Sequence, residues 1–148
     1  MSGGALKGGD ISITADRIDI AGEVPGISNA VIASVTNGTS LPHDPAAKKS
    51  GDITILTRTL RMGANGFLFS DLDDVASGRG GDVSIIATEE IGIDLDPEVA
   101  EISVISASVC GFGTRCRSGF TGRGGNLFVE AGRIKMRGAA NIEASTSG

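Results

Sequence analysis

The sequence predicts an all-β protein built as a solenoid of stacked repeats. Three observations lead to this prediction: a Gly-rich and aromatic-poor composition, a phrase that recurs four times, and apolar residues that alternate with polar ones. Of the 148 residues, 23 are Gly and only 5 are aromatic, all of them Phe, whereas Gly usually makes up about 7% of a protein. Ile, Val and Leu must therefore fill a thin interior with little room for large rings.

The composition also excludes several other classes of protein. Apolar residues make up 40% of the chain and the formal net charge is −5, a combination that disordered proteins do not have. No apolar run approaches the roughly 18 residues of a membrane-spanning helix, so we expect a chain that does not span a membrane. The 13 basic residues give no nucleic-acid footprint. The first residues carry no secretion signal, so any export signal is expected outside this chain.

A phrase that begins with Gly-Gly or Ser-Gly recurs at 8–13, 50–55, 80–85 and 124–129. In each copy an acidic or amide residue follows the second residue, and these four corner anchors are Asp10, Asp52, Asp82 and Asn126. Their spacings of 42, 30 and 44 residues are typical of solenoid repeats. We expect the glycine to permit a tight corner and the anchor side chain to cap backbone N–H groups there.

Three short strands are expected in each repeat. The recurring phrase is the first strand, and a second apolar alternation follows each anchor by eight or nine residues. The second-strand pairs are Ile18/Ile20, Leu60/Met62, Ile91/Ile93 and Ile134/Met136, and the third-strand apolar positions are Ile32, Leu68, Ile105 and Ile142. The third strand comes six to seven residues later in the first and third repeats, which predicts insertions at 22–29 and 94–103.

The four repeat units, 8–49, 50–79, 80–123 and 124–148, are expected to form one domain of about four rungs. One unit cannot bury its own apolar side, so like residues must stack above like. At about 4.8 Å per rung the stack would be only about 20 Å tall, with exposed strand edges at both ends. We therefore expect the chain to be part of a longer array.

The phrase Gly-Gly-Asp-Ile-x-Ile-x-Ala at 8–15, then Arg-Ile-x-Ile at 17–20 and Ile-x-Ala-Ser-Thr at 142–146, resembles the repeats of filamentous-haemagglutinin-like exoproteins. These are bacterial surface proteins exported by two-partner secretion, and the Gly-rich repeats of cyanobacterial members are especially similar. The resemblance implies a right-handed parallel β-helix, the pectin-lyase-like fold, and a secreted or cell-surface, outer-membrane-associated protein. It further implies an adhesive or envelope-structural role and an outer-membrane secretion partner for the full-length protein.

The resemblance carries no catalytic residue to this chain, and the Asn-Pro motifs of the family's secretion domain are missing. The chain is therefore identified with the repeat shaft, without catalytic residues, cofactor-binding residues or metal ligands. Its variable loops are the expected contacts for a surface glycan or protein, because the packed rungs leave only the loops free to vary.

The alternative is a fragment of a carbohydrate-active β-helix enzyme, of the polysaccharide lyase or hydrolase type. Its candidate residues are the acidic groups Asp71, Asp73 and Asp74, with Arg79 nearby, and Asp94, Asp96 and Glu98. Acidic loops of this kind are more often solvated turns, and a weak Ca²⁺ site is a further possibility. Carboxylates stacked on one face beside a groove would favour the enzyme, whereas scattered ones would favour the shaft.

Cys110 and Cys116 enclose a short loop that contains two glycines and can bring them to bridging distance. Outside the cell such a pair is expected to form a local disulfide, with two free thiols as the alternative. His43 lies in a Pro-bounded loop and is expected to be solvated. Asn37-Gly38-Thr39 matches a glycosylation acceptor, but we expect a turn. A small basic cluster, Arg115, Arg117 and Arg123, is interpreted as a solvated face or a contact for acidic polysaccharide.

Overall fold

The computed structural model describes residues 8–22, 29–37, 48–73, 78–95, 102–108 and 122–145. Within these ranges the chain contains strands and no helix, and every strand pair is parallel. The prediction of an all-β fold is therefore confirmed. The described residues include no helix whose length and apolar character would let it cross a lipid bilayer.

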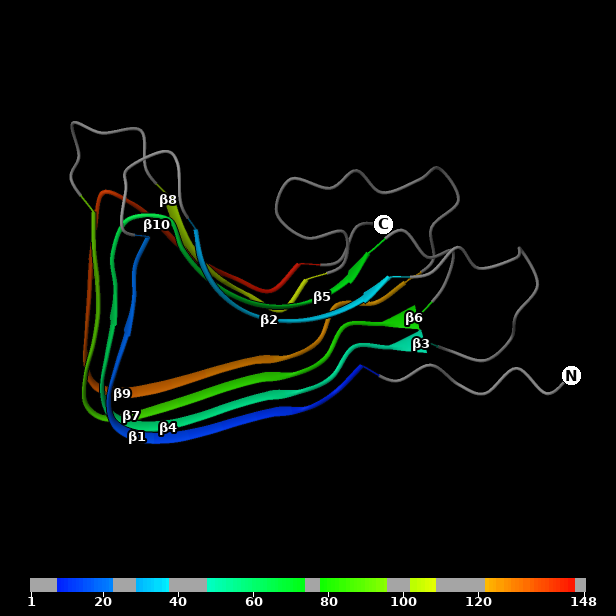
Figure 1. Ribbon diagram of the computed structural model, residues 1–148, viewed down its shortest axis with the longest axis horizontal. Helices are drawn as coiled ribbons and strands as arrows, with labels where there is room; N and C mark the ends of the chain where they lie inside the picture. Colours follow the sequence, from blue (N-terminus) through cyan, green and yellow to red (C-terminus); the bar gives the residue numbers. More distant parts are fainter. Residues whose placement is uncertain are drawn as a thin grey trace, which may run out of the picture.

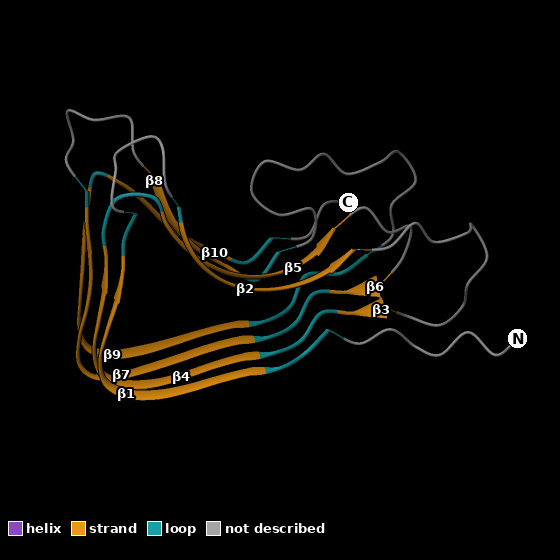
Figure 2. Cartoon of the chain, viewed as in Figure 1, coloured by secondary structure: helices purple, strands orange, loops and turns teal. Residues whose placement is uncertain are grey.

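Two four-stranded parallel sheets lie on opposite sides of a shared core (Figure 1). The first sheet has the order β1 (Ile11–Ile20), β4 (Ile53–Met62), β7 (Val83–Asp94) and β9 (Leu127–Arg137). The second has the order β2 (Ala30–Asn37), β5 (Gly66–Asp73), β8 (Ile102–Ser106) and β10 (Ala139–Glu143). A small third sheet pairs β3 (Lys48–Lys49) with β6 (Gly78–Arg79). Each large sheet takes one strand from each repeat in chain order (Figure 2), an arrangement compatible with a β-helix.

The register between repeats follows the alignment expected from the sequence. The predicted second-strand positions are in register on neighbouring strands of the first sheet, in the order Ile18, Leu60, Ile91 and Ile134. The third-strand positions Ile32, Leu68, Ile105 and Ile142 are likewise in register on the second sheet. In the two middle repeats these side chains are fully buried, so the predicted apolar ladders form the core.

The division of each repeat into three short strands differs from the structure. The expected first and second strands form one continuous strand of 10 to 12 residues, which bends between its two halves (Figure 1). The bend does not interrupt the strand because parallel neighbours pair on both sides of it. The longer offset of the third repeat is absorbed there as a bulge, since Thr57 pairs with Ala87 but Thr59 pairs with Glu90.

The recurring Gly-Asp phrase joins one repeat to the next. The backbone N–H of Asp52 donates to the carboxylate of Asp10 at 2.9 Å, and that of Asp82 donates to Asp52 at 2.8 Å. Asn126 continues the series, because its backbone N–H donates to Asp82 at 2.7 Å and its side-chain amide does so at 2.9 Å. Each of the three acidic anchors therefore caps an N–H group of the following repeat.

The glycine before each anchor lies against the preceding repeat. A Cβ atom at Gly51, Gly81 or Gly125 would overlap the carbonyl oxygen of the equivalent glycine one repeat earlier. At Gly9 the same Cβ atom would have no neighbour within 4 Å. Close stacking, and not a positive φ angle, is therefore what requires glycine at the three later corners.

Tight turns connect the two sheets in the second and fourth repeats. Residues 63–65 join β4 to β5, and Gly138 alone joins β9 to β10. Asn65 has a φ angle of 52° and Gly138 one of 70°, the left-handed conformation that such turns need. In the first and third repeats the longer connections coincide with the predicted insertions, and much of them lies outside the described residues.

Candidate functional site: a charged groove on the first sheet

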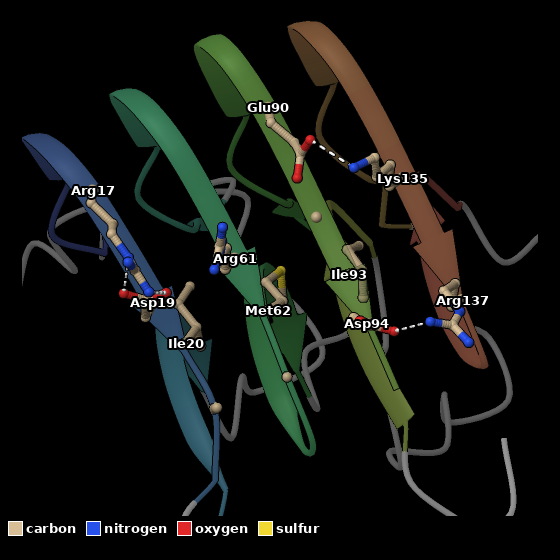
Figure 3. A pocket seen from close by; sticks show the side chains of 13 residues that line it. Arg17, Asp19, Ile20, Arg61, Met62, Glu90, Ile93, Asp94, Lys135 and Arg137 are labelled. Atoms are coloured by element: carbon tan, nitrogen blue, oxygen red, sulfur yellow. Dashed lines mark hydrogen bonds and ion pairs between the residues drawn. The ribbon is translucent and has the colours of Figure 1, made fainter. Parts of the chain in front are cut away.

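A groove with a volume of about 460 Å³ crosses the ends of the four strands of the first sheet (Figure 3). Its lining residues come from all four repeats and are mostly charged or small. They are Arg17, Asp19, Ile20, Ala21, Arg61, Met62, Gly63, Glu90, Gly92, Ile93, Asp94, Lys135 and Arg137. The groove exists because strands of consecutive repeats end side by side.

Gly92 accounts for the hollow in the middle of this groove. It pairs with Arg61 on one side and with Lys135 on the other, and Arg61 in turn pairs with Asp19. A Cβ atom at Gly92 would meet only Oε1 of Glu90, at an ordinary contact distance of 3.5 Å. The fold therefore does not require glycine here, and the missing side chain leaves space between two cationic neighbours.

Ion pairs occupy most of the charged groups around the groove (Figure 3). Arg17 pairs with Asp19 at 2.6 Å, Lys135 with Glu90 at 3.2 Å and Arg137 with Asp94 at 3.6 Å. Glu90 also accepts a 2.7 Å hydrogen bond from Arg133, just outside the groove. Arg61 has no ion-pair partner among the described residues, so its guanidinium is the cation best placed to bind an external anion.

The carboxylates of Asp19 and Glu90 are held in the charged form. The hydrogen bond from Arg17 lowers the pKa of Asp19, and hydrogen bonds from Lys135 and then Arg133 lower the pKa of Glu90. A general acid for glycoside cleavage needs a raised pKa so that it still holds a proton near neutral pH. These two groups are therefore suited to accepting hydrogen bonds from a ligand and not to donating a proton.

The structure separates the acidic residues singled out in the sequence. Asp94 lines the groove at the end of β7, whereas Asp71 is buried on β5, where it accepts a hydrogen bond from the backbone N–H of Ser108 at 3.2 Å. Asp73 ends β5, and its side chain lies outside the described residues, as do Asp74, Asp96 and Glu98. Arg79 makes an ion pair with Asp82 at 2.8 Å. The described residues thus bring no two members of the two acidic groups together.

Several other candidates lie outside the described residues: Cys110, Cys116, His43, Arg115 and Arg117. Of the basic cluster only Arg123 is described, and it is exposed, in a parallel bridge with Arg79. Asn37 is the last residue of β2, while Gly38 and Thr39 lie beyond the described range.

Arg61, Gly92 and Lys135 were not among the candidate residues predicted from the sequence. Once the repeats are aligned on their anchors, the signal is present: these residues and Asp19 lie nine residues after the anchor, or ten in the bulged third repeat. Along the stack this column reads Asp, Arg, Gly and Lys, so a glycine interrupts a series of exposed charged residues. A search along single strands misses it because the groove is formed across repeats.

Among the described residues no three His, Cys, Asp or Glu side chains are grouped so that they could hold a metal ion. The groove is therefore characterised by its ion pairs, its glycine floor and Arg61. No family model matches the chain, and comparisons with curated proteins and with solved structures likewise give no match.

Proposed function

We propose that this chain is a segment of the rigid shaft of a filamentous-haemagglutinin-like exoprotein. In this proposal the chain is a right-handed parallel β-helix, a single-stranded solenoid of about four rungs within a longer array. It is non-catalytic, is exported through an outer-membrane partner, and serves adhesion or envelope structure at the cell surface or after secretion.

The observation that carries this proposal is the continuous register of the four repeats. Four anchors joined by three successive hydrogen bonds tie each repeat to the next, and apolar ladders run through the same stack. A structure joined in this way resists bending and stretching along its axis, which is the property that a shaft requires. The residues that join the repeats are structural, and this role requires no catalytic group.

The groove supports the adhesive part of the proposal. A surface glycan with carboxylate or sulfate groups would place one anion beside Arg61, in the space above Gly92. Asp19 and Glu90 lie around the same space as hydrogen-bond acceptors for sugar hydroxyls (Figure 3). None of the described residues that line the groove is aromatic, so binding to them rests on charge and hydrogen bonds and not on stacking against a ring.

One observation favours the second candidate, a carbohydrate-active enzyme fragment. Asp19, Glu90 and Asp94 lie on one face beside the groove, next to basic residues. Against it, ion pairs lower the pKa of Asp19 and Glu90, whereas hydrolysis requires one protonated carboxyl group. Incubation with polygalacturonate, alginate and chondroitin sulfate separates the two candidates, since an enzyme releases reducing or unsaturated ends and a shaft releases none.

Protease treatment of intact cells that produce the full-length protein tests the main proposal. We expect the repeat region to be digested without permeabilising the outer membrane, while a periplasmic control protein stays intact. Deleting the outer-membrane secretion partner should abolish this digestion. Protection of the repeat region until the cells are lysed would contradict the proposed location.

A further inference from the structure

The charged residues that line the groove change sign between the second, third and fourth repeats (Figure 3). From the first repeat to the fourth they are Arg17 with Asp19, Arg61, Glu90 with Asp94, and Lys135 with Arg137. The net charges of the four repeats along the groove are therefore 0, +1, −2 and +2. Because neighbouring strands lie about 4.8 Å apart, the two cationic repeats are about 10 Å apart, with the acidic repeat between them.

Two positive charges in this series are left without a carboxylate of their own among the described residues. One is Arg61, which makes no ion pair there. The other is shared by Lys135 and Arg133, because both contact the same oxygen of Glu90, at 3.2 Å and 2.7 Å. One carboxylate cannot neutralise two cations, so the fourth repeat keeps one excess positive charge.

Gly92 lies midway between these two charges, because it pairs with Arg61 on one side and with Lys135 on the other. On its own strand Glu90 comes two residues before it and Asp94 two residues after it, so all three lie on the same face of β7. A Cβ atom at Gly92 would have Oε1 of Glu90 as a neighbour at 3.5 Å. The centre of the groove thus offers space between two carboxylates, which accept hydrogen bonds from hydroxyl groups and repel a further anion.

We propose that the groove binds a linear polysaccharide that carries a carboxylate on every second sugar and runs along the stack of repeats. One pyranose unit is about as long as the spacing of neighbouring strands, about 4.8 Å, so successive sugars fall over successive repeats. One carboxylate then lies on the Arg61 side of the central space and the next on the Lys135 side. The neutral sugar between them lies over Gly92 and donates its hydroxyl groups to Glu90 and Asp94.

The spacing of the charges favours this ligand over three others. A polyuronate with a carboxylate on every sugar would place one of them over Gly92, between Glu90 and Asp94. A neutral glycan would leave both excess cations unpaired. An extended acidic peptide repeats the side chains of one face about every 7 Å, which does not match cations about 10 Å apart.

This inference depends on the glycan-binding part of the proposed function and specifies its ligand. Isothermal titration calorimetry of the purified 148-residue chain with three hexasaccharides tests it. A hyaluronan hexasaccharide carries a carboxylate on every second sugar, hexagalacturonate carries one on every sugar, and chitohexaose carries none. We expect the hyaluronan hexasaccharide to bind about fivefold more tightly than hexagalacturonate, and chitohexaose not to bind measurably. Attraction by charge alone predicts the opposite order for the two acidic ligands.

Variants on the second, third and fourth repeats test the spacing itself. Arg61→Gln and Lys135→Gln should each weaken binding of the hyaluronan hexasaccharide about fivefold. Asp94→Asn removes one carboxylate beside Gly92 and should reduce the preference for hyaluronan over hexagalacturonate about threefold. Asp16→Asn, which removes a carboxylate of the same sheet outside the groove, is the matched control and should leave the preference unchanged. Far-UV circular dichroism checks that each variant is folded.

The possible results separate this inference from the proposed function. Hexagalacturonate that binds as tightly as the hyaluronan hexasaccharide would overturn the inference and leave a groove that binds acidic glycans. Tighter binding of a peptide of alternating glutamate and serine would overturn it in favour of an acidic protein partner. If none of the three hexasaccharides binds, the glycan-binding part of the proposed function fails as well, whereas the protease test on intact cells still decides the location of the shaft.

Discussion

The backbone N–H of Asp82 donates a 2.8 Å hydrogen bond to the carboxylate of Asp52, which lies 30 residues earlier in the chain. The same carboxylate forms an ion pair with Lys49 at 2.8 Å. The Asp52 side chain thus contacts both a residue of its own corner and the backbone of the next repeat. Asp82 repeats the arrangement, with an ion pair to Arg79 and a hydrogen bond from the N–H of Asn126, so the effects of changing such an anchor can be predicted.

Replacing Asp52 by Ala should lower the free energy of unfolding by about 1–2 kcal/mol, because the N–H of Asp82 loses its acceptor. Asp52→Asn keeps an acceptor oxygen and should cost less than half as much. Urea denaturation followed by circular dichroism measures both changes. Equal losses for the two variants would mean that the charge, and not the bond between repeats, is what stabilises the corner.

The stability of the protein should fall in acid. Burial raises the pKa of Asp52, but the hydrogen bonds from Lys49 and from the Asp82 N–H outweigh it and leave that pKa below its ordinary value. The hydrogen bond from Arg58 likewise lowers the pKa of Asp16. A lowered folded-state pKa gives stability that is present above the unfolded value of about 4 and is lost as the pH falls through the folded one.

Urea midpoints measured between pH 7 and pH 2.5 check this pH dependence. The midpoint should be nearly constant above about pH 5 and decrease below about pH 4, the range set by the carboxylate pKa values. Asp52→Asn should make the decrease shallower. A midpoint that rises on acidification would show that repulsion between carboxylates dominates instead.

Two glycine-to-alanine changes should have opposite effects. Gly81→Ala brings a Cβ atom into the Gly51 carbonyl, and we expect a loss of about 3 kcal/mol or more in the free energy of unfolding. Gly92→Ala finds open space and should raise it by about 0.5 kcal/mol, since alanine restricts the unfolded chain. Thermal unfolding of both variants decides the matter, and similar losses would contradict the role assigned to close stacking.

Filling the groove should reduce binding of an acidic saccharide without unfolding the protein. Gly92→Val occupies the space between Arg61 and Lys135, and Arg61→Gln removes the cation that has no partner in the described structure. We expect each to weaken binding of oligogalacturonate or chondroitin sulfate oligosaccharides at least fivefold in isothermal titration calorimetry. Arg58→Gln, on the same strand but outside the groove, is the matched control. Binding that neither groove variant changes would place the glycan contact elsewhere.

The two left-handed turn positions allow a further comparison. Asn65 adopts a φ of 52° and its side-chain nitrogen is buried without a hydrogen-bond partner. Asn65→Gly should therefore raise the free energy of unfolding by about 1 kcal/mol. Gly138→Ala should lower it by about 1–2 kcal/mol, because alanine is strained at that φ and its Cβ atom would approach Leu95. Chemical denaturation measures both, and a destabilised Asn65→Gly would mean that the asparagine side chain itself holds the turn.

Much of the fold could be predicted from the sequence because the repeat encodes its own register. The anchors Asp10, Asp52, Asp82 and Asn126 fix which residues lie side by side, and the apolar ladders follow from that alignment. The continuity of each long strand could not be predicted, because a bend between two alternating segments resembles a loop in sequence. The bulge at Ala87–Glu90 was visible only as one extra residue.

The groove was harder to predict than the fold, for a physical reason. Its central residues, Arg61, Gly92 and Lys135, are separated by 31 and 43 positions in the chain and meet only through parallel pairing. A pattern of neighbouring residues reveals an acidic loop, but it does not reveal residues at equivalent positions of different repeats. The proposed function is therefore inferred from the resemblance of the recurring phrase, whereas the groove is inferred from the three-dimensional structure.

The bulge in β7 has a consequence for how such a chain changes length. It inserts a residue at the bend, yet Leu60, Ile91 and Ile134 are back in line immediately afterwards. Variation in the size of one repeat is therefore confined to that repeat, and the surfaces that meet its neighbours stay the same. Gene duplication or deletion could then add or remove whole units without any compensating change elsewhere, so that the length of the molecule evolves independently of its sequence.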